Sequence, residues 1–179
     1  ANMIATHKKL NWAQNLHIVL GRNYDMVKDT GGYWQLTTDS IGEGFHYYSL
    51  LIDGVAIADP ASETFYGMGR MASGIEIPFT GGAYYAIKDV PHGDVSIKKY
   101  YSSTTNSWRR MYVYTPPGYD SNTTEKYPAL YLLHGGGEDE RGWATQGKTD
   151  LIIDNLLSEK KAKPMLVVMM DGNFGSGGI

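Results

Sequence analysis

The stretch Ala129–Trp143 reads ALYLLHGGGEDERGW. It begins with an apolar run typical of a buried strand and continues with a histidine, a row of glycines and a run of charge. Glycine loses more conformational freedom on folding than any other residue, so consecutive glycines indicate that something approaches the backbone closely. We predict that an oxyanion approaches here and accepts hydrogen bonds from backbone N–H groups.

A second apolar run, Met165–Met170, follows further along the chain. Both runs predict strands buried on both faces of a parallel sheet. The segment between them, about Thr149 to Lys161, predicts a helix with Thr149 or Asp150 as its N-cap. One side of this helix is apolar and carries Leu151, Ile152, Leu156 and Leu157. Strand, loop, helix and strand form a right-handed βαβ unit, whose ligands bind at the carboxyl ends of the strands, where the glycines lie.

Upstream of the glycines the sequence pattern predicts antiparallel strands. Residues 95–119 predict two strands joined by a polar turn at Thr104–Ser107 and ended by Pro116-Pro117-Gly118. Residues 1–80 predict short strands with turns about every 10 residues, typical of an immunoglobulin-like β-sandwich, and Asp53-Gly54 predicts a two-residue hairpin. Residues 81–95 predict a linker, and residues 96–179 form the second domain.

Composition excludes several classes of protein. The chain has 179 residues, 42% of them hydrophobic, and a net charge of −3 without a basic run, which argues against nucleic-acid binding. It contains 0 cysteines, so a disulfide framework and thiolate metal sites are excluded. No apolar stretch approaches the roughly 20 residues of a membrane span, and the start lacks the apolar centre of a signal peptide. We expect no membrane contact, and if the protein is exported its signal precedes residue 1.

The glycine motif suits ester hydrolysis. In α/β-hydrolases one oxyanion N–H comes from an HGGG-type loop after an early strand, and another comes from the residue after the nucleophilic serine. We predict that the N–H groups of Gly136 and Gly137 are oxyanion donors, because a side chain there would block the substrate. The alternative is a tight turn with no catalytic role. His134 is expected to shape the loop, because the catalytic histidine of this fold comes last in chain order.

A family resemblance covers Arg109–Gly178. The blocks RRMYVYTPPGYD, YPALYLLHGGG, DLIIDNLL and KPMLVVMMDGN resemble the start of the catalytic domain of the putative-esterase family, which includes feruloyl esterases and acetylxylan esterases of carbohydrate esterase family one. The segment GGYWQLTT…SGIEIP resembles the N-terminal immunoglobulin-like domain, related to glycan-binding modules, that precedes this catalytic domain. The resemblance implies an α/β-hydrolase fold, a serine nucleophile, an acid and a histidine, and no metal or organic cofactor.

The nucleophile of that family lies on a G-x-S-x-G elbow, and none occurs in these residues. Ser176 has Phe174 two residues before it, so a polar loop is the better interpretation. We therefore expect the catalytic residues outside this chain, with Ile179 marking a cut or break and the missing C-terminal part present as a further segment or a second fragment. An intact mass of only about 20 kDa would argue against this.

Other candidates are weaker. Gly135, His134, Trp143 and Gln146 are candidates for lining the substrate pocket, although packing accounts equally well for Trp143. Glu138-Asp139-Glu140 could bind a cation, but a solvated loop is the simpler interpretation. His92 and Asp94 are expected to form a turn. The aromatic residues Trp34, Tyr47 and Tyr48 could stack on sugar rings or fill the core of the first domain.

The resemblance thus implies a secreted or periplasmic esterase of plant cell-wall polysaccharide that releases hydroxycinnamates from arabinoxylan. Acetylxylan esterase and enterochelin-type siderophore esterase are alternatives of the same class. A non-catalytic glycan-binding protein is the alternative from another class.

Overall fold

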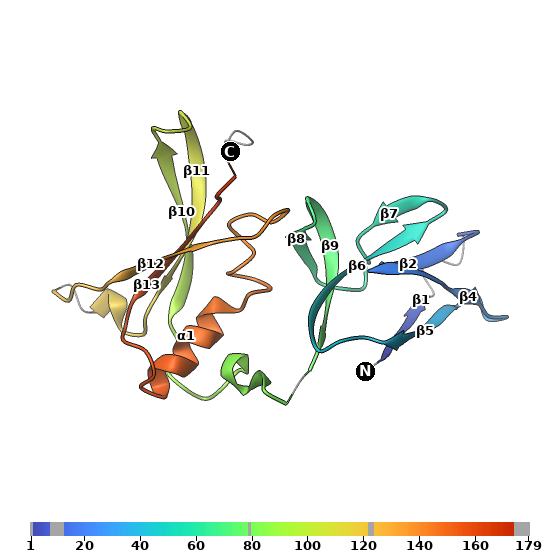
Figure 1. The fold of residues 1–179 in the computed structure, drawn as a ribbon, viewed down its shortest axis with the longest axis horizontal. Helices are drawn as coiled ribbons and strands as arrows, with labels where there is room; N and C mark the ends of the chain where they lie inside the picture. The colour runs from blue at the N-terminus through green and yellow to red at the C-terminus, as the bar shows by residue number, and fades with distance from the viewer. Residues whose placement is uncertain (1, 8–12, 79, 122–123, 174–179) are drawn as a thin grey trace. The chain divides into compact units, whose positions relative to one another are not determined.

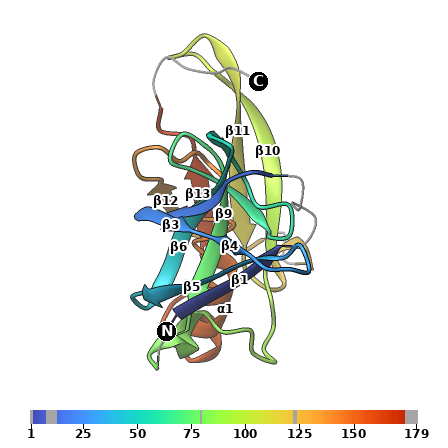
Figure 2. The ribbon, with the colours of Figure 1, turned by 90° about the vertical axis from the view of Figure 1, so that its right-hand side faces the viewer.

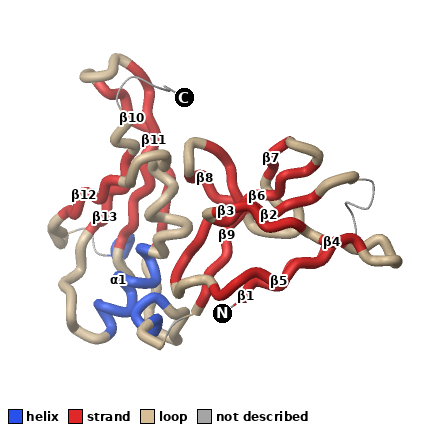
Figure 3. The backbone as a smooth tube through the Cα atoms, turned by 45° about the vertical axis from the view of Figure 1, so that its right-hand side comes forward, coloured by secondary structure: helices blue, strands red, loops and turns tan. Residues whose placement is uncertain are grey.

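The computed structural model describes residues 2–7, 13–78, 80–121 and 124–173. The chain divides into two compact units, Ala1–Phe79 and Thr80–Ile179 (Figure 1). Among the described residues the first unit contains strands and no helix, and the helical segments belong to the second unit (Figure 3). Ser176, which the sequence analysis weighed as a nucleophile and assigned to a polar loop, lies outside the described residues.

The first unit contains two antiparallel sheets. One has the order β1-β5-β4, and the other has the order β3-β2-β6-β9-β8, with β7 also paired to β6. Their bounds are β1 Asn2–His7, β2 Leu16–Leu20, β3 Arg22–Asp25, β4 Val27–Lys28, β5 Trp34–Ser40, β6 Gly44–Ile52, β7 Val55–Ile57, β8 Thr64–Gly67 and β9 Arg70–Ile77.

Figure 2 shows β1 and β5 of the first sheet running at an angle to β6 and β9 of the second. Met3 and Trp34 of the first sheet share one buried core with Ile18 and Leu50 of the second. The unit is therefore held together by apolar contact between its two sheets. The immunoglobulin-like topology predicted for it stays a prediction.

The hairpin predicted at Asp53-Gly54 is confirmed. Ile52 pairs directly with Val55, so the loop between β6 and β7 has two residues. Asp53 and Gly54 have φ of 48° and 87°, as a type I′ turn requires.

The second unit contains one four-stranded sheet with the order β10-β11-β13-β12 (Figure 1). The strands are β10 Asp94–Ser102, β11 Ser107–Thr115, β12 Ala129–Leu133 and β13 Leu166–Met170. The pair β12 and β13 is parallel, and the pairs β10–β11 and β11–β13 are antiparallel. The predicted antiparallel hairpin and parallel pair are both confirmed. A single-turn 3₁₀ helix, η1 (Gly82–Tyr85), and a second, η2 (Tyr119–Ser121), complete the unit.

Helix α1 (Thr149–Ser158) covers one face of this sheet. Ile153 of α1 packs in a common core with Tyr114, Val167 and Met169, each of which is 0% exposed. The helix connects β12 to β13, so it lies where a parallel crossover places it.

The helix differs from the prediction at both ends and in its buried face. Lys148, in the left-handed region at φ 49°, is the N-cap in place of Thr149 or Asp150, and the helix ends at Ser158 rather than Lys161. The Thr149 hydroxyl donates to the Trp143 carbonyl, which removes it as a cap. Asp154 and Asn155 are buried although they are polar.

The expectation that both parallel strands are buried on both faces is wrong for β12. Leu130, Tyr131 and Leu133 are exposed, whereas Val167 and Met169 of β13 are fully buried against α1. The reason is that β12 is an edge strand that pairs only with β13 among the described strands. An apolar run therefore predicted the strand correctly and its burial incorrectly.

Candidate active site

The glycine loop begins directly after β12. The N–H of Glu138 donates to the carbonyl of Gly135 at 3.3 Å, which closes a tight turn. Gly137 has φ of 78°, in the left-handed region that side chains disfavour. All three glycines are exposed, and a Cβ at Gly135 or Gly136 would meet no atom within 4 Å. The loop therefore presents bare backbone on its outer side.

The N–H groups of Gly136 and Gly137 have no hydrogen-bond acceptor among the described residues. Backbone donors in proteins are nearly always paired with protein or water. Unpaired N–H groups on exposed glycines can donate to an oxyanion without obstruction by a side chain. This placement is compatible with the predicted role of both glycines.

His134 is anchored beneath the loop. Its side chain is 4% exposed, and its Nδ1 lies 2.8 Å from the carbonyl oxygen of Gly135. Its Nε2 lies 3.1 Å from the N–H nitrogen of Gly172 and 3.0 Å from Oδ1 of Asp171. Burial acts to lower the pKa of His134, but the hydrogen bonds to Gly135 and Asp171 outweigh it, so the pKa is raised. The predicted role of His134 in shaping the loop agrees with these contacts.

Asp171, the first residue after β13, is held by an arginine that the sequence analysis did not single out. Nη2 of Arg109 lies 3.0 Å from Oδ2 of Asp171 and donates to the carbonyl oxygens of Asp171 and Asn173 at 2.9 and 3.0 Å. Arg109 lies on β11 and is 7% exposed. Burial acts to raise the pKa of Asp171, but the Asn173 N–H, His134 and Arg109 together lower it.

The ends of β12 and β13 thus meet at one edge of the sheet, as expected for parallel neighbours. The amide group of Asn173 donates to the carbonyl of Glu138 at 3.1 Å, which joins the two ends a second time. The signal that could have identified Asp171 is its position directly after an apolar strand beside the glycine loop. Arg109 gave no local signal, because its partners are 62 and 64 residues away.

The pocket candidates Trp143 and Gln146 differ in position. The indole Nε1–H of Trp143 donates to the carbonyl of Leu133 at 2.8 Å, so Trp143 lies beside the start of the loop and remains partly exposed. Gln146 accepts a hydrogen bond from the hydroxyl of the neighbouring Thr145. The structure therefore brings Trp143 against the strand end from which the glycine loop starts.

The acidic run after the glycines is not a simple solvated loop. Glu140 is 6% exposed and forms an ion pair with Arg110 of β11. Asp139 accepts hydrogen bonds from the backbone and side chain of Arg141. No group of three or more possible metal ligands occurs in the described part of the chain. Paired charges therefore account for the run.

His92 and Asp94 do not form a site together. His92 contacts Oδ2 of Asp154 at 2.9 Å, and the N–H of Gly93 donates to Oδ1 of the same carboxylate at 3.0 Å. These bonds attach the segment before β10 to α1. The turn predicted for His92 and Asp94 is wrong, because Asp94 begins β10 and pairs with Thr115, and the contacts of His92 and Gly93 serve packing.

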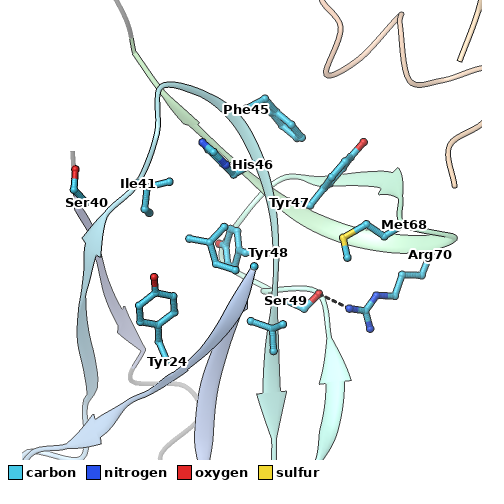
Figure 4. Close-up of a pocket in the computed structure, with 13 residues that line it drawn as sticks. Tyr24, Ser40, Ile41, Phe45, His46, Tyr47, Tyr48, Ser49, Met68 and Arg70 are labelled. Carbon is cyan, nitrogen blue, oxygen red and sulfur yellow. Dashed lines mark hydrogen bonds between the residues drawn. The ribbon is translucent and has the colours of Figure 1, made fainter. Parts of the chain in front are cut away.

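A separate pocket of about 490 Å³ lies in the first unit (Figure 4). It is lined partly by Phe45, His46 and Tyr47 of β6, together with Tyr24 and Arg70. Of the aromatic residues singled out in the sequence, Trp34 and Tyr48 are buried in the core, at 6% and 5% exposure, although Tyr48 also borders the pocket.

No described helix is long and apolar enough to cross a membrane. This finding concerns only the residues that the structure describes.

Comparison with known proteins finds similarity to esterases. Residues 102–176 match the model of the family described as "Putative esterase". An endo-1,4-beta-xylanase/feruloyl esterase of Xylanibacter ruminicola is 43% identical over 161 residues, covering 84% of this chain and 22% of that protein. Endo-1,4-beta-xylanase Y of Acetivibrio thermocellus is 28% identical over 127 residues, covering 70% of this chain and 11% of that protein. The chain therefore spans less than a quarter of the length of these relatives.

Among solved structures, the enterobactin esterase of Shigella flexneri is similar with a TM-score of 0.66 and 17% identity, over 97% of this chain and 52% of that one. At this identity the likeness shows the fold alone, and it extends over about half of that protein.

Proposed function

We propose that this chain is the front part of a carboxylic ester hydrolase that acts on plant cell-wall polysaccharide and releases hydroxycinnamates from arabinoxylan. The observation that carries the proposal is the glycine loop, whose exposed N–H groups at Gly136 and Gly137 have no acceptor among the described residues. The 43% identity to a protein named as a xylanase and feruloyl esterase supports the substrate class.

In the proposed reaction a serine hydroxyl attacks the ester carbonyl, and a histidine takes the proton and returns it to the leaving alcohol. Water then hydrolyses the acyl-enzyme. The carbonyl oxygen becomes negatively charged in each tetrahedral intermediate, and the N–H groups of Gly136 and Gly137 stabilise that charge. Losing one such donor costs about 3 to 4 kcal/mol of barrier. No metal or organic cofactor takes part.

The serine, acid and histidine are proposed to come from residues outside these 179, because the sequence contains no G-x-S-x-G elbow. A fluorophosphonate label followed by peptide mapping of the full-length protein tests this. We expect one labelled serine, at a position beyond Ile179. A label on a serine within the chain would contradict the proposal.

The substrate is tested with the full-length protein on methyl ferulate, acetylated xylan and a catecholate siderophore. We expect the highest kcat/KM on methyl ferulate. Faster turnover of acetylated xylan or of the siderophore would replace the proposal with acetylxylan esterase or enterochelin-type esterase, and no turnover of any ester would refute esterase activity. A secreted or periplasmic location fits a polymeric plant substrate.

A glycan-binding role for the first unit is a second candidate, favoured by the pocket beside β6. The ring of Tyr47 rests over Gly67, where a Cβ would lie 2.2 Å from its Cζ, so the ring is held at the pocket wall by close packing. Aromatic faces held in this way can stack on sugar rings. Affinity electrophoresis on arabinoxylan should show weaker retention for Tyr47→Ala than for Tyr84→Ala, an exposed tyrosine in the other unit. Equal retention of the two variants would remove this candidate.

A further inference from the structure

We propose that His134 is a positioning residue that orients the peptide group between Gly135 and Gly136, and that Asp171 and Arg109 hold its ring in place. The inference rests on the proposed esterase function. It assigns a task to three side chains to which the proposed reaction gives no role.

The geometry of the peptide group provides the first step. The bond between Gly135 and Gly136 is trans, since the described residues contain no cis peptide bond. In a trans peptide the carbonyl and the following N–H point in opposite directions. The Gly135 carbonyl accepts from His134 Nδ1 at 2.8 Å and from the Glu138 N–H at 3.3 Å. The Gly136 N–H therefore points away from the imidazole.

The tautomer of His134 follows from its partners. The Gly135 carbonyl can only accept and the Gly172 N–H can only donate, so the neutral ring carries its hydrogen on Nδ1 and accepts at Nε2. When the ring is protonated, Nε2–H donates to Asp171 instead. The Nδ1–H bond to Gly135 is present in both states, so the orientation of the peptide group does not depend on the titration of His134.

The imidazole ring of His134 is held in place by Asp171, which is itself held by Arg109. Asp171 has a side chain that is 15% exposed, and Arg109 contacts both its carboxylate and its carbonyl. Arg109 comes from β11, whereas Asp171 follows β13, so the anchor extends across two paired strands of the sheet. A residue bonded at both nitrogens and buried to this degree is not available as a general base, which leaves positioning as its contribution.

Two substitutions separate the contacts of the two ring nitrogens. In His134→Asn the amide nitrogen occupies roughly the place of Nδ1 and can still donate to Gly135. In His134→Gln the amide reaches the place of Nε2 and loses the Gly135 bond. Both variants are compared in the full-length enzyme on methyl ferulate, with kcat corrected for active sites by fluorophosphonate titration and with melting temperature as a control for folding.

We expect His134→Gln to lower kcat by about 10²-fold with KM unchanged, because an oxyanion donor acts only in the transition state. The affinity for a trifluoromethyl ketone analogue should fall by the same factor. His134→Asn should retain most of the wild-type kcat. An equal loss in both variants, an unchanged kcat in His134→Gln, or a rise in KM with constant kcat would overturn the inference.

A measurement on the wild-type protein keeps the inference testable if the variants do not fold. The ¹⁵N shifts of the His134 ring, recorded above its pKa, should report the Nδ1–H tautomer. The Nε2–H tautomer would overturn the inference, because Gly135 would then have no imidazole donor. An inactive wild-type enzyme with the Nδ1–H tautomer would instead refute the proposed function and leave the orientation of the peptide group intact.

Discussion

Replacing the buried Asp154 should weaken the attachment of α1 more than any surface change. Its carboxylate accepts from the hydroxyl of Tyr114 at 2.6 Å and from the N–H of Gly93 at 3.0 Å, and it contacts His92 at 2.9 Å. Asp154 is 2% exposed and Tyr114 is 0% exposed. Burial, and then the bond to Asp154, raises the pKa of Tyr114, so its hydroxyl remains a donor at all ordinary pH values.

The magnitude follows from the donors left behind. In Asp154→Ala the Tyr114 hydroxyl and the Gly93 N–H both lose their acceptor, at about 1 to 3 kcal/mol each. The contact with His92 is half-exposed and adds little. The expected loss is therefore about 2 to 6 kcal/mol, a large part of the roughly 5 to 15 kcal/mol that stabilises a typical domain. Asp154→Asn keeps a carbonyl oxygen for both donors and should cost about 1 kcal/mol.

Hydrogen exchange of α1 measured by mass spectrometry gives the free energy of opening directly. Combining Asp154→Ala with Tyr114→Phe should cost less than the sum of the two single changes, because phenylalanine leaves no hydroxyl to satisfy. Equal costs for Asp154→Ala and Asp154→Asn, or a double variant that is strictly additive, would refute the reasoning.

Three further outcomes are expected. Gly54→Ala should lower the stability by about 1 to 2 kcal/mol, because Gly54 has a φ of 87° that alanine disfavours. The control Gly42→Ala should leave the melting temperature nearly unchanged, because its Cβ would meet no atom within 4 Å. Equal shifts in the two variants would contradict this. Trp143→Phe removes the donor to the carbonyl before His134 and should cost about 0.5 to 1.5 kcal/mol by urea denaturation; no loss would remove Trp143 as a support of the loop. The raised pKa of His134 contributes stability that is complete below about pH 6.5 and is lost as the pH rises through the pKa of the folded state. The lowered pKa of Asp171 contributes stability that is lost as the pH falls through the pKa of the folded state. A pH series of urea midpoints should therefore show a smaller alkaline decline in His134→Asn than in the wild type, because the raised pKa of His92 beside Asp154 still contributes its own share. A decline that persists unchanged would contradict the assignment.

The local features of the fold could be predicted from sequence because each has a local cause. Asp53-Gly54 determines a hairpin since both residues tolerate positive φ, and the apolar runs at 129–133 and 165–170 predict strands by composition. The order of the sheet, with β13 between β11 and β12, has no such signature, because it is determined by pairing between distant segments.

Only the glycine part of the candidate site could be predicted from the sequence, for the same reason. The three consecutive glycines at 135–137 could be recognised in the sequence, because glycine loses more conformational freedom on folding than other residues. The support of His134 by Asp171 and Arg109 depends on residues that meet only after the sheet has formed. Glu140 illustrates this too, since its burial depends on Arg110, which lies 30 residues earlier.

The most direct test of the account is a crystal structure of the full-length enzyme with a phosphonate bound covalently to its nucleophile. The account predicts that the phosphonyl oxygen lies about 2.7 to 3.1 Å from the backbone nitrogens of Gly136 and Gly137. A phosphonyl oxygen bound elsewhere, with these two N–H groups paired to protein carbonyls, would contradict it.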